Sequence, residues 1–132
     1  MIAYKETKHF PQEQIAQLFA SVEWETPEDA DMLVRAFANS TRVISAWDGE
    51  RLVGIIRSMD DDLWSANIDC LVVHRDYQGQ GIGSALVKQL LERLRHVKYV
   101  SVSPSERENI SFYEKLGVTA LEGSALLQIT NY

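Results

Sequence analysis

Three glycines at alternate positions are the part of the sequence best suited to chemistry. They lie in the segment Gln78-Gly79-Gln80-Gly81-Ile82-Gly83-Ser84, directly before apolar residues at helical spacing. Glycines allow consecutive backbone amides to turn to one side, and a helix start leaves its first amides unpaired and carries partial positive charge. The segment therefore predicts a site for a phosphate or pyrophosphate group that needs no lysine or arginine.

Two common phosphate-binding loops do not fit this segment. A P-loop ends in Gly-Lys-Ser/Thr, whereas Gly83-Ser84-Ala85 contains no lysine. The dinucleotide fingerprint Gly-x-Gly-x-x-Gly needs a glycine where Ser84 stands, and it follows its strand directly, whereas residues 74–78 separate Val73 from Gly79. A solvent-exposed loop without a ligand stays open as an alternative.

The segment also resembles the Gln/Arg-x-x-Gly-x-Gly/Ala signature of the GCN5-related N-acetyltransferases, the GNAT family. Phe112-Tyr113-Glu114-Lys115-Leu116-Gly117 is similar to a second motif of that family, and Leu52-Val53-Gly54 after Asp48-Gly49 is similar to its hairpin into the third strand. These motifs follow the family's order over residues 41–118. The strand–helix order, and Val22-Glu23-Trp24 followed by an acidic helix, are similar to the small bacterial and plastid members of the GNAT family.

The resemblance implies acetyl-CoA as cosubstrate and no metal. Backbone amides of the glycine segment would hold the CoA pyrophosphate, and the pantetheine arm would pair with the preceding strand like an extra strand. The implied residues for the pyrophosphate are Gln78, Gly79, Gln80, Gly81, Ile82, Gly83 and Ser84, and those for pantetheine are Leu71, Val72 and Val73.

The resemblance also implies Tyr113 as the general acid that protonates the departing CoA sulfur. A phenol with a pKa of about 10 is a weaker acid than a thiol at about 8.5, so the transfer is uphill by roughly 2 kcal/mol. A hydrogen bond to the sulfur makes that cost tolerable as charge develops. The alternative is a half-buried tyrosine that packs in the core beside Phe112.

Asn109 is the candidate for a contact with pantetheine. Family members usually carry this asparagine where the present chain has Glu106, whereas Asn109 lies one helical turn before Tyr113. Asn109 is therefore either the pantetheine contact at a position shifted from the family's usual one, or a simple helix cap.

The group that accepts the proton of the amine is open among several candidates. Asp69 is the first, because a carboxylate within a predicted strand is unusual; the alternative is an acid bonded to nearby backbone. His74 is expected at the surface, and Asp60–Asp62 is expected to form a solvated turn. Deprotonation through water would need no single base.

Strand alternation predicts how these side chains point. It places Asp69, Leu71 and Val73 on one face of the strand and Cys70 on the other. We interpret Cys70 as a small core residue, because no His-Asp pair is spaced to activate it as a nucleophile. Three tryptophans are candidates for an acceptor pocket for aromatic amines, although packing also explains each of them: Trp24, Trp47 and Trp64.

The elements that must position these residues follow from hydrophobic periodicity. Helices are expected after Pro11 and Pro27, the second ending near Asn39, and strands over residues 41–47, 51–58 and 66–73. Leucines at four-residue steps predict the longest helix, from Ile82 to about His96. A strand over 99–103, a helix over 106–116 stopped by Gly117, and strands over 118–122 and 126–130 complete the chain.

These elements predict an α+β fold. The first three strands form an antiparallel meander, and the strand over 99–103 runs parallel to the strand over 66–73 because a helix joins them. The resemblance implies a GNAT-like mixed sheet with helices on both faces, in which this parallel pair splays to form the acyl-CoA groove.

Length and charge limit the remaining possibilities. A chain of 132 residues is one domain, 1–132, and 13 Lys and Arg against 19 Asp and Glu give a net charge of −6, which disfavours general nucleic-acid binding. The single cysteine excludes an internal disulfide, and no apolar run approaches the roughly 18 residues of a membrane span. Residues 1–6 contain no apolar core of a secretory signal. We therefore expect a cytoplasmic protein without nucleic-acid or membrane partners, and we allow for a homodimer.

The sequence thus predicts an enzyme that transfers acetyl from acetyl-CoA to a primary amine by direct attack in a ternary complex. The acceptor is a small-molecule or peptide amine that the sequence does not identify. The alternative is a non-catalytic domain of the same fold that senses CoA or an acyl-CoA.

Overall fold

The computed structural model describes residues 1–24, 27–104, 109–121, 127–128 and 130. Within these residues, five strands form one sheet in the order β1-β2-β3-β4-β5. The strands are β1 (Ile2–Lys5), β2 (Arg42–Asp48), β3 (Arg51–Asp60), β4 (Ser65–Val73) and β5 (Tyr99–Val102). The helices are α1 (Gln12–Ser21), α2 (Ala30–Ala38), α3 (Ile82–Arg93) and α4 (Asn109–Glu114), with short 3₁₀ turns at Pro27–Asp29 and Arg75–Tyr77.

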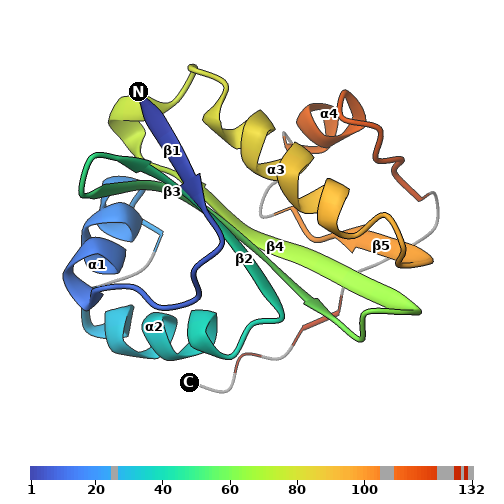
Figure 1. Cartoon of the computed structure of the whole chain (residues 1–132), viewed down its shortest axis with the longest axis horizontal. Helices are drawn as coiled ribbons and strands as arrows, with labels where there is room; N and C mark the ends of the chain where they lie inside the picture. Colours follow the sequence, from blue (N-terminus) through green and yellow to red (C-terminus); the bar gives the residue numbers. More distant parts are fainter. Residues whose placement is uncertain (25–26, 105–108, 122–126, 129, 131–132) are drawn as a thin grey trace.

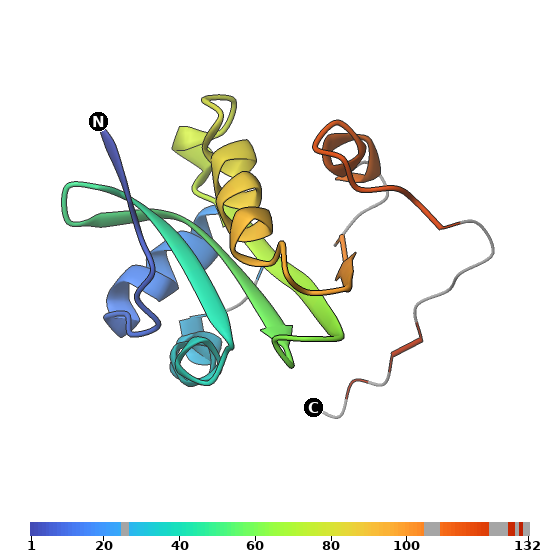
Figure 2. The same cartoon turned by 45° about the vertical axis from the view of Figure 1, so that its right-hand side comes forward.

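The sheet is antiparallel from β1 to β4, and only the pair of β4 and β5 is parallel. Figures 1 and 2 show α1 and α2 on one face of the sheet and α3 with α4 on the other. This arrangement confirms the predicted α+β class, the antiparallel meander and the parallel pair joined by the longest helix.

Two apolar clusters hold these layers together, one on each face of the sheet. In α1, the buried residues Ile15, Leu18 and Phe19 repeat at helical spacing and pack on the sheet with Phe37 of α2. In α3, four buried residues form the stripe that contacts the opposite face: Ile82, Leu86, Val87 and Leu90. The sheet is therefore covered by helices on both faces, as the sequence analysis predicted.

Strand β1 was absent from the sequence prediction. Its four residues alternate between half-buried and exposed, which is too short a pattern to distinguish from a loop. It is a strand because it pairs with β2, whose partner residues lie forty or more positions along the chain, from Ile2 opposite Asp48 to Lys5 opposite Ser45. The helix expected to end near His96 ends at Arg93.

The C-terminal predictions are met in part. Helix α4 ends at Glu114, and Gly117 follows with φ +95°, the left-handed conformation predicted for a residue that stops a helix. The expected start of this helix at Glu106 lies outside the described residues. The strand expected over 118–122 is wrong for 118–121, which are exposed or half-buried and form no strand pairing, and residue 122 lies outside the described residues. Of the strand expected over 126–130, the described residues 127, 128 and 130 are also not in a strand.

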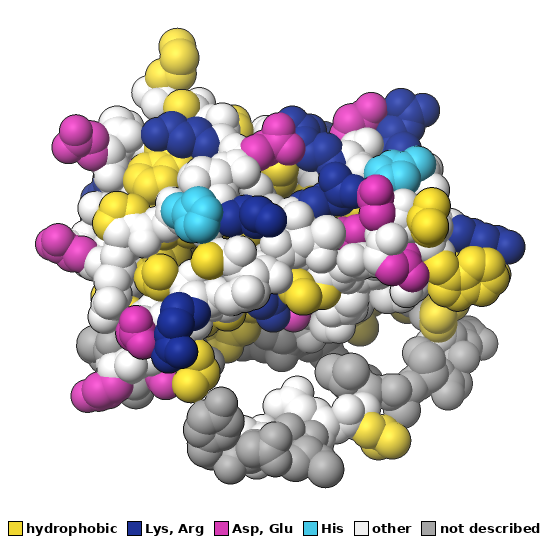
Figure 3. Space-filling view, turned by 60° about the horizontal axis from the view of Figure 1, so that its bottom comes forward, with side chains coloured by type: hydrophobic (Ala, Val, Ile, Leu, Met, Phe, Trp, Pro, Cys, Tyr) yellow, Lys and Arg dark blue, Asp and Glu magenta, His cyan; other side chains and the backbone are white. Residues whose placement is uncertain are grey.

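The surface carries charges of both signs. On the face in Figure 3, acidic and basic side chains alternate with scattered hydrophobic ones, so the net charge of −6 is not gathered into one field there. Among the helices of the described residues, none combines the length and hydrophobicity needed to cross a membrane.

Candidate active site

The two parallel strands separate midway along β4. Their pairing runs from Ser65 opposite Tyr99 to Ile68 opposite Val102, and ends where the Ser103 amide donates to the Ile68 carbonyl at 3.0 Å. Strand β4 continues to Val73, so residues 69–73 have no β5 partner in the described part of the chain. The predicted splay is present, and among the described residues it leaves the β5-facing edge of residues 69–73 without a strand partner.

A bulge in β4 lies at the start of this unpaired stretch. Asp69 pairs with Arg57 and Val72 with Ile55, so that two residues of β4, Cys70 and Leu71, lie opposite one residue of β3. Cys70 has φ +56°, a conformation that side chains other than glycine rarely adopt. The register of side chains therefore reverses at Cys70.

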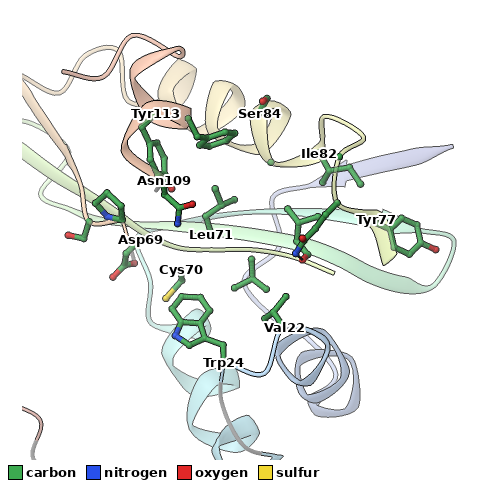
Figure 4. Close-up of a pocket in the computed structure, with 18 of the residues that line it drawn as sticks. Val22, Trp24, Asp69, Cys70, Leu71, Tyr77, Ile82, Ser84, Asn109 and Tyr113 are labelled. Atoms are coloured by element: carbon green, nitrogen blue, oxygen red, sulfur yellow. Dashed lines mark hydrogen bonds between the residues drawn. The ribbon is translucent and has the colours of Figure 1, made fainter. Parts of the chain in front are cut away.

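This reversal overturns the predicted alternation. Leu71 and Val73 pack with the cluster under α3, whereas Cys70 packs with the cluster under α1 and α2. Figure 4 shows the Asp69 and Cys70 side chains on one side of β4 and Leu71 on the other. Asp69 thus does not share a face with Leu71 and Val73, because the bulge adds one residue to the alternating pattern.

The glycine segment turns the chain from β4 into α3. Gly79 and Gly81 have φ +81° and +85°, and Gly81 is the residue that caps α3 without any side-chain hydrogen bond. A Cβ on either glycine would meet no atom within 4 Å, so their backbone faces open space. The Gln78 side chain donates from Nε2 to the Val73 carbonyl at 3.0 Å and ties the loop to the end of β4. The first turn of α3 therefore presents amides to an approachable surface.

One pocket of about 1130 Å³ connects the splayed strand with this helix start. All the residues predicted from the sequence as catalytic or cofactor-binding line it, with the exception of Gln80, which is exposed at the outside of the loop. Those that line it are Asp69, Leu71, Val72, Val73, Gln78, Gly79, Gly81, Ile82, Gly83, Ser84, Asn109 and Tyr113.

Tyr113 reaches this pocket from α4 and is 5% exposed. Its ring packs edge-on against Phe112 with centroids 5.1 Å apart, and in Figure 4 it lies with Asn109 above Leu71. Burial, with a smaller contribution from the charge of Asp69, raises the pKa of Tyr113 to about 12. The phenol therefore holds its proton more firmly than a tyrosine in water.

Asp69 is held by an ion pair that the sequence analysis missed. Arg57 on β3 donates from Nε to Asp69 Oδ1 at 2.7 Å and from Nη2 to Oδ2 at 3.4 Å. Hydrogen bonding to this carboxylate raises the pKa of Arg57, so the guanidinium stays charged. The signal was present in the sequence as opposite charges on strands expected to be neighbours, and the regular register from Asp60 opposite Ala66 brings Arg57 opposite Asp69 before the bulge begins.

The other candidate bases lie outside the pocket. His74 was expected at the surface and is 7% exposed. Its Nδ1 accepts from the Asp76 amide at 3.1 Å and its Nε2 lies 3.0 Å from Arg51 Nη2, because it caps the turn at Arg75–Tyr77. In the Asp60–Asp62 turn, Asp61 Oδ1 accepts from three backbone amides and lines no part of the pocket.

Cys70 and one tryptophan line the pocket on the α1 side. Burial and the neighbouring Asp69 raise the pKa of Cys70 to about 11, which leaves the thiol protonated and agrees with its predicted role as a packing residue. Trp24 lines the pocket, while Trp47 is buried against Phe10 and Trp64 is exposed beside Tyr99. Within the described residues, no group of three or more His, Cys, Asp or Glu side chains is arranged to hold a metal ion.

In comparisons with known proteins, the relatives reported below are all named as acetyltransferases. The sequence matches the Acetyltransferase (GNAT) family over residues 10–118. It is 33% identical over 116 residues to an uncharacterized N-acetyltransferase ycf52 of Porphyra purpurea and 32% identical over 109 residues to that of Pyropia yezoensis, covering 84% and 79% of this chain. The chain covers 66% and 62% of those proteins, less than two thirds of each.

Solved structures share the fold. An acetyltransferase of the GNAT family from Streptococcus pneumoniae superposes with a TM-score of 0.81 at 28% identity, and each chain is covered completely. A probable acetyltransferase from Staphylococcus aureus gives a TM-score of 0.83 at 21% identity, again over the whole of both chains. Since the match to the family extends from residue 10 to residue 118, the chain belongs to the GNAT acetyltransferase family.

Proposed function

We propose that this chain transfers the acetyl group of acetyl-CoA to a primary amine, with both substrates bound at the same time. The observation that carries the proposal is a single pocket in which the unpaired stretch of β4 meets the glycine-capped start of α3. Membership of the GNAT family supports acyl transfer. The acceptor and the cytoplasmic location stay predictions, as does a homodimer; one relative, from Arabidopsis thaliana, is named chloroplastic.

The residues present fit CoA. A pantetheine arm needs backbone partners in an extended strand, and β4 offers Leu71, Val72 and Val73 beyond the end of β5. A pyrophosphate needs several donors without bulky side chains in the way, and the open backbone at Gly79 and Gly81 before α3 meets that need. The remaining loop residues assigned to the pyrophosphate are Gln78, Gln80, Ile82, Gly83 and Ser84, and Asn109 is assigned to pantetheine.

Acetyl-CoA supplies an activated acyl group: the amine nitrogen bonds to the thioester carbonyl carbon, the carbon–sulfur bond breaks, the nitrogen gives up one proton and the sulfur takes up one. Tyr113 is proposed to donate to the sulfur. With its pKa at about 12 against about 8.5 for a free thiol, complete proton transfer from Tyr113 to the departing thiolate is uphill by roughly 5 kcal/mol. Tyr113 therefore acts first as a hydrogen-bond donor and loses its proton only as charge develops on sulfur.

Asp69 is proposed to receive the proton of the amine, directly or through water. Its side chain lies on the other side of β4 from Leu71, Asn109 and Tyr113, so the proposed proton acceptor and the proposed proton donor lie on opposite sides of the strand (Figure 4). The Arg57 contact fixes both carboxylate oxygens in orientation. An Asp69→Asn variant that keeps the wild-type kcat would exclude this role and leave Asp69 as a structural partner of Arg57.

The proposal is tested by the release of free thiol from acetyl-CoA in the presence of different amines. A panel of polyamines, arylalkylamines, amino acids, aminoglycosides and lysine peptides covers the main acceptor classes. We expect at least one amine to accelerate thiol release, with one N-acetylated product formed per thiol by mass spectrometry. A chain that binds CoA but releases no thiol with any of these amines would instead support a CoA-sensing domain.

A further inference from the structure

The glycine segment needs an anchor at each end to hold its amides in one arrangement. Gly79 and Gly81 have positive φ, and a Cβ on either would meet no atom within 4 Å, so packing around these two residues does not fix them. Glycine loses more backbone freedom on ordering than any other residue, and a loop that is ordered before its ligand arrives binds it more tightly. Ile82, which is 3% exposed in the cluster under α3, anchors the C-terminal end. The N-terminal end follows directly after Tyr77.

The Tyr77 hydroxyl ties this N-terminal end to the β2–β3 hairpin. It donates to Asp48 Oδ2 at 2.5 Å. Asp48 is the last residue of β2 and lies opposite Arg51, the first residue of β3. The hydrogen bond to Asp48 raises the pKa of Tyr77, so the hydroxyl keeps its proton and remains the donor. A hydrogen bond to a carboxylate is shorter and stronger than one between neutral groups, so this contact joins the hairpin firmly to the turn.

Two further residues hold the ring and the backbone of Tyr77. The Arg51 guanidinium lies over the ring at 5.6 Å from its centroid, and the His74 ring meets it edge-on with centroids 5.7 Å apart. Arg51 Nη2 also lies 3.0 Å from His74 Nε2, and the Tyr77 amide donates to the His74 carbonyl at 2.8 Å. The hydroxyl, the ring and the amide of Tyr77 are therefore each held by the hairpin or by the residue that caps the turn.

Tyr77 lines the pocket without facing the proposed reacting centre. Figure 4 shows it at the opposite end of the pocket from Tyr113, with its hydroxyl directed away from Leu71 and Tyr113. Since the hydroxyl donates its proton to Asp48, Tyr77 is not a second proton donor for the leaving sulfur. Its place directly before Gln78 and Gly79 is that of a residue that sets where the glycine segment begins.

We infer that Tyr77 is a positioning residue for the CoA pyrophosphate and that Asp48 acts through it. Their hydrogen bond fixes the start of the glycine segment to the β2–β3 hairpin, in the arrangement that presents the loop amides to the ligand. The inference rests on the proposed function and adds two side chains that act without touching the pyrophosphate. A residue that only packs would stabilise the fold and leave the affinity of the folded chain for CoA unchanged.

Removal of the Tyr77 hydroxyl separates these two roles. Tyr77→Phe keeps the ring and its contacts with Arg51 and His74, so we expect the dissociation constant for CoA, measured by calorimetry, to rise about three- to tenfold, as the loss of one net hydrogen bond does. The KM for acetyl-CoA should rise similarly with little change in kcat. Tyr99→Phe is the matched control, because it removes the same hydroxyl from an exposed tyrosine outside the pocket and should change neither value.

A truncated acyl donor locates the effect within the cosubstrate. S-acetylpantetheine carries the thioester and the pantetheine arm but no pyrophosphate. We therefore expect its kcat/KM to be the same for Tyr77→Phe and the wild type, whereas kcat/KM for acetyl-CoA falls in the variant. An equal fall with both donors would show a general distortion of the pocket and would overturn the inference.

Substitutions of Asp48 test whether the two residues act through one bond. Asp48→Ala removes the acceptor and should weaken CoA binding as Tyr77→Phe does, while Asp48→Asn keeps an oxygen that accepts from the hydroxyl and should restore most of the affinity. The double variant Tyr77→Phe/Asp48→Ala should bind CoA no more weakly than either single variant, because all three lack the same hydrogen bond. Additive losses in the double variant, or wild-type affinity in Tyr77→Phe, would contradict the inference.

Failure of the proposed function would give a different result. If no amine accelerates thiol release, the transferase proposal fails, and the inference is still decided by the dissociation constants for CoA in the Tyr77 and Asp48 variants. If amines are acetylated and Tyr77→Phe binds CoA as tightly as the wild type, the inference fails alone. A wild-type chain that binds no CoA overturns both.

Discussion

At the scale of single residues, Tyr113 combines a packed position in the core with a place in the lining of the pocket. It belongs to the cluster under α3 and is almost completely buried, yet it also lines the pocket beside the unpaired stretch of β4. Burial raises its pKa to about 12, since the phenolate would lie in a poorly solvated site. The two interpretations offered by the sequence, a packed tyrosine and a proton donor, are therefore compatible.

Removal of the Tyr113 hydroxyl tests the proton-donor role. Tyr113→Phe keeps the ring and its contact with Phe112, but it removes the hydroxyl proposed to donate a hydrogen bond to the leaving sulfur in the transition state. We expect kcat to fall by at least about tenfold, a bound below the usual range of about 10²–10⁴ for a general acid because solvent can also protonate the sulfur. The measurement is steady-state kinetics with the best amine of the panel. A Phe variant with wild-type kcat would return Tyr113 to the core, and one that loses CoA affinity would make it a residue that positions the cosubstrate.

At the scale of elements, the candidate site lies where β4 extends beyond the end of β5 and where the glycine segment precedes the first turn of α3. The bulge at Cys70 turns Leu71 and Val73 toward α3, and the loop brings the helix start to the end of the same strand. Backbone groups rather than side chains provide most of the proposed CoA contacts. The most informative substitutions are therefore those that change the backbone surface without removing a side chain.

Gly81→Val is such a substitution, and Gly49→Val is its matched control. Both glycines have positive φ and open space at the Cβ position, but Gly49 lies in the β2–β3 turn outside the pocket. Each valine should lower the melting temperature through backbone strain, whereas only the Gly81 variant should bring a side chain between the loop amides and the pyrophosphate. We expect the dissociation constant for CoA, measured by calorimetry, to rise at least about tenfold for Gly81→Val alone. Equal CoA affinity in the two folded variants would exclude the proposed pyrophosphate site.

The sequence predicted those elements whose own residues carry a clear period. Helix α3 follows from leucines at four-residue steps, and its start follows from the positive-φ glycine directly before it. Strand β1 could not be predicted in this way because it depends on pairing with β2 far along the chain. Alternation failed in β4 for a related reason, since nothing in the local pattern marks Cys70 as the residue with positive φ.

The candidate site was predicted better than the details of its side chains. The glycine segment and the motif around Tyr113 are each a short, continuous run of residues, so each can be recognised in the sequence alone. Residues of both line one pocket. The pairing of Arg57 with Asp69 and the burial of His74 depend on neighbouring strands and turns. Such contacts are set by tertiary register, which a single sequence does not reveal.

At the scale of the whole molecule, the turn at Arg75–Tyr77 connects the folded sheet with the glycine segment proposed to bind CoA. His74 anchors this turn, and three groups face it: Arg51 on β3 and, within the turn itself, the Asp76 amide and the Tyr77 ring, whose centroid lies 5.7 Å away. Burial and the charge of Arg51 lower the pKa of His74. Protonation would place an N–H group against each of two donors and break the cap.

The lowered pKa predicts loss of stability in mild acid. Because folded His74 binds a proton less readily than unfolded His74, the unfolded state gains protons first as the pH falls below about 6.5. This contribution to stability is thus complete above that pH and is lost below it. We expect the melting temperature of the wild type to fall more between pH 7 and pH 5 than that of His74→Asn, which keeps an acceptor for the Asp76 amide but does not titrate. An equal fall in melting temperature between pH 7 and pH 5 for the two proteins would show that His74 does not cause the loss of stability in acid.

The central claim is that the pocket between β4 and α3 binds CoA, and titration calorimetry with CoA, NAD and ATP tests it most directly. We predict saturable binding of one CoA per chain and a rise in melting temperature with CoA concentration, because a ligand of the folded state stabilises it by about 2.7 kcal/mol at a hundred times its dissociation constant. NAD and ATP should bind much more weakly, since neither carries a pantetheine arm to pair with the free edge of β4. Binding of NAD together with an absence of CoA binding would contradict the account.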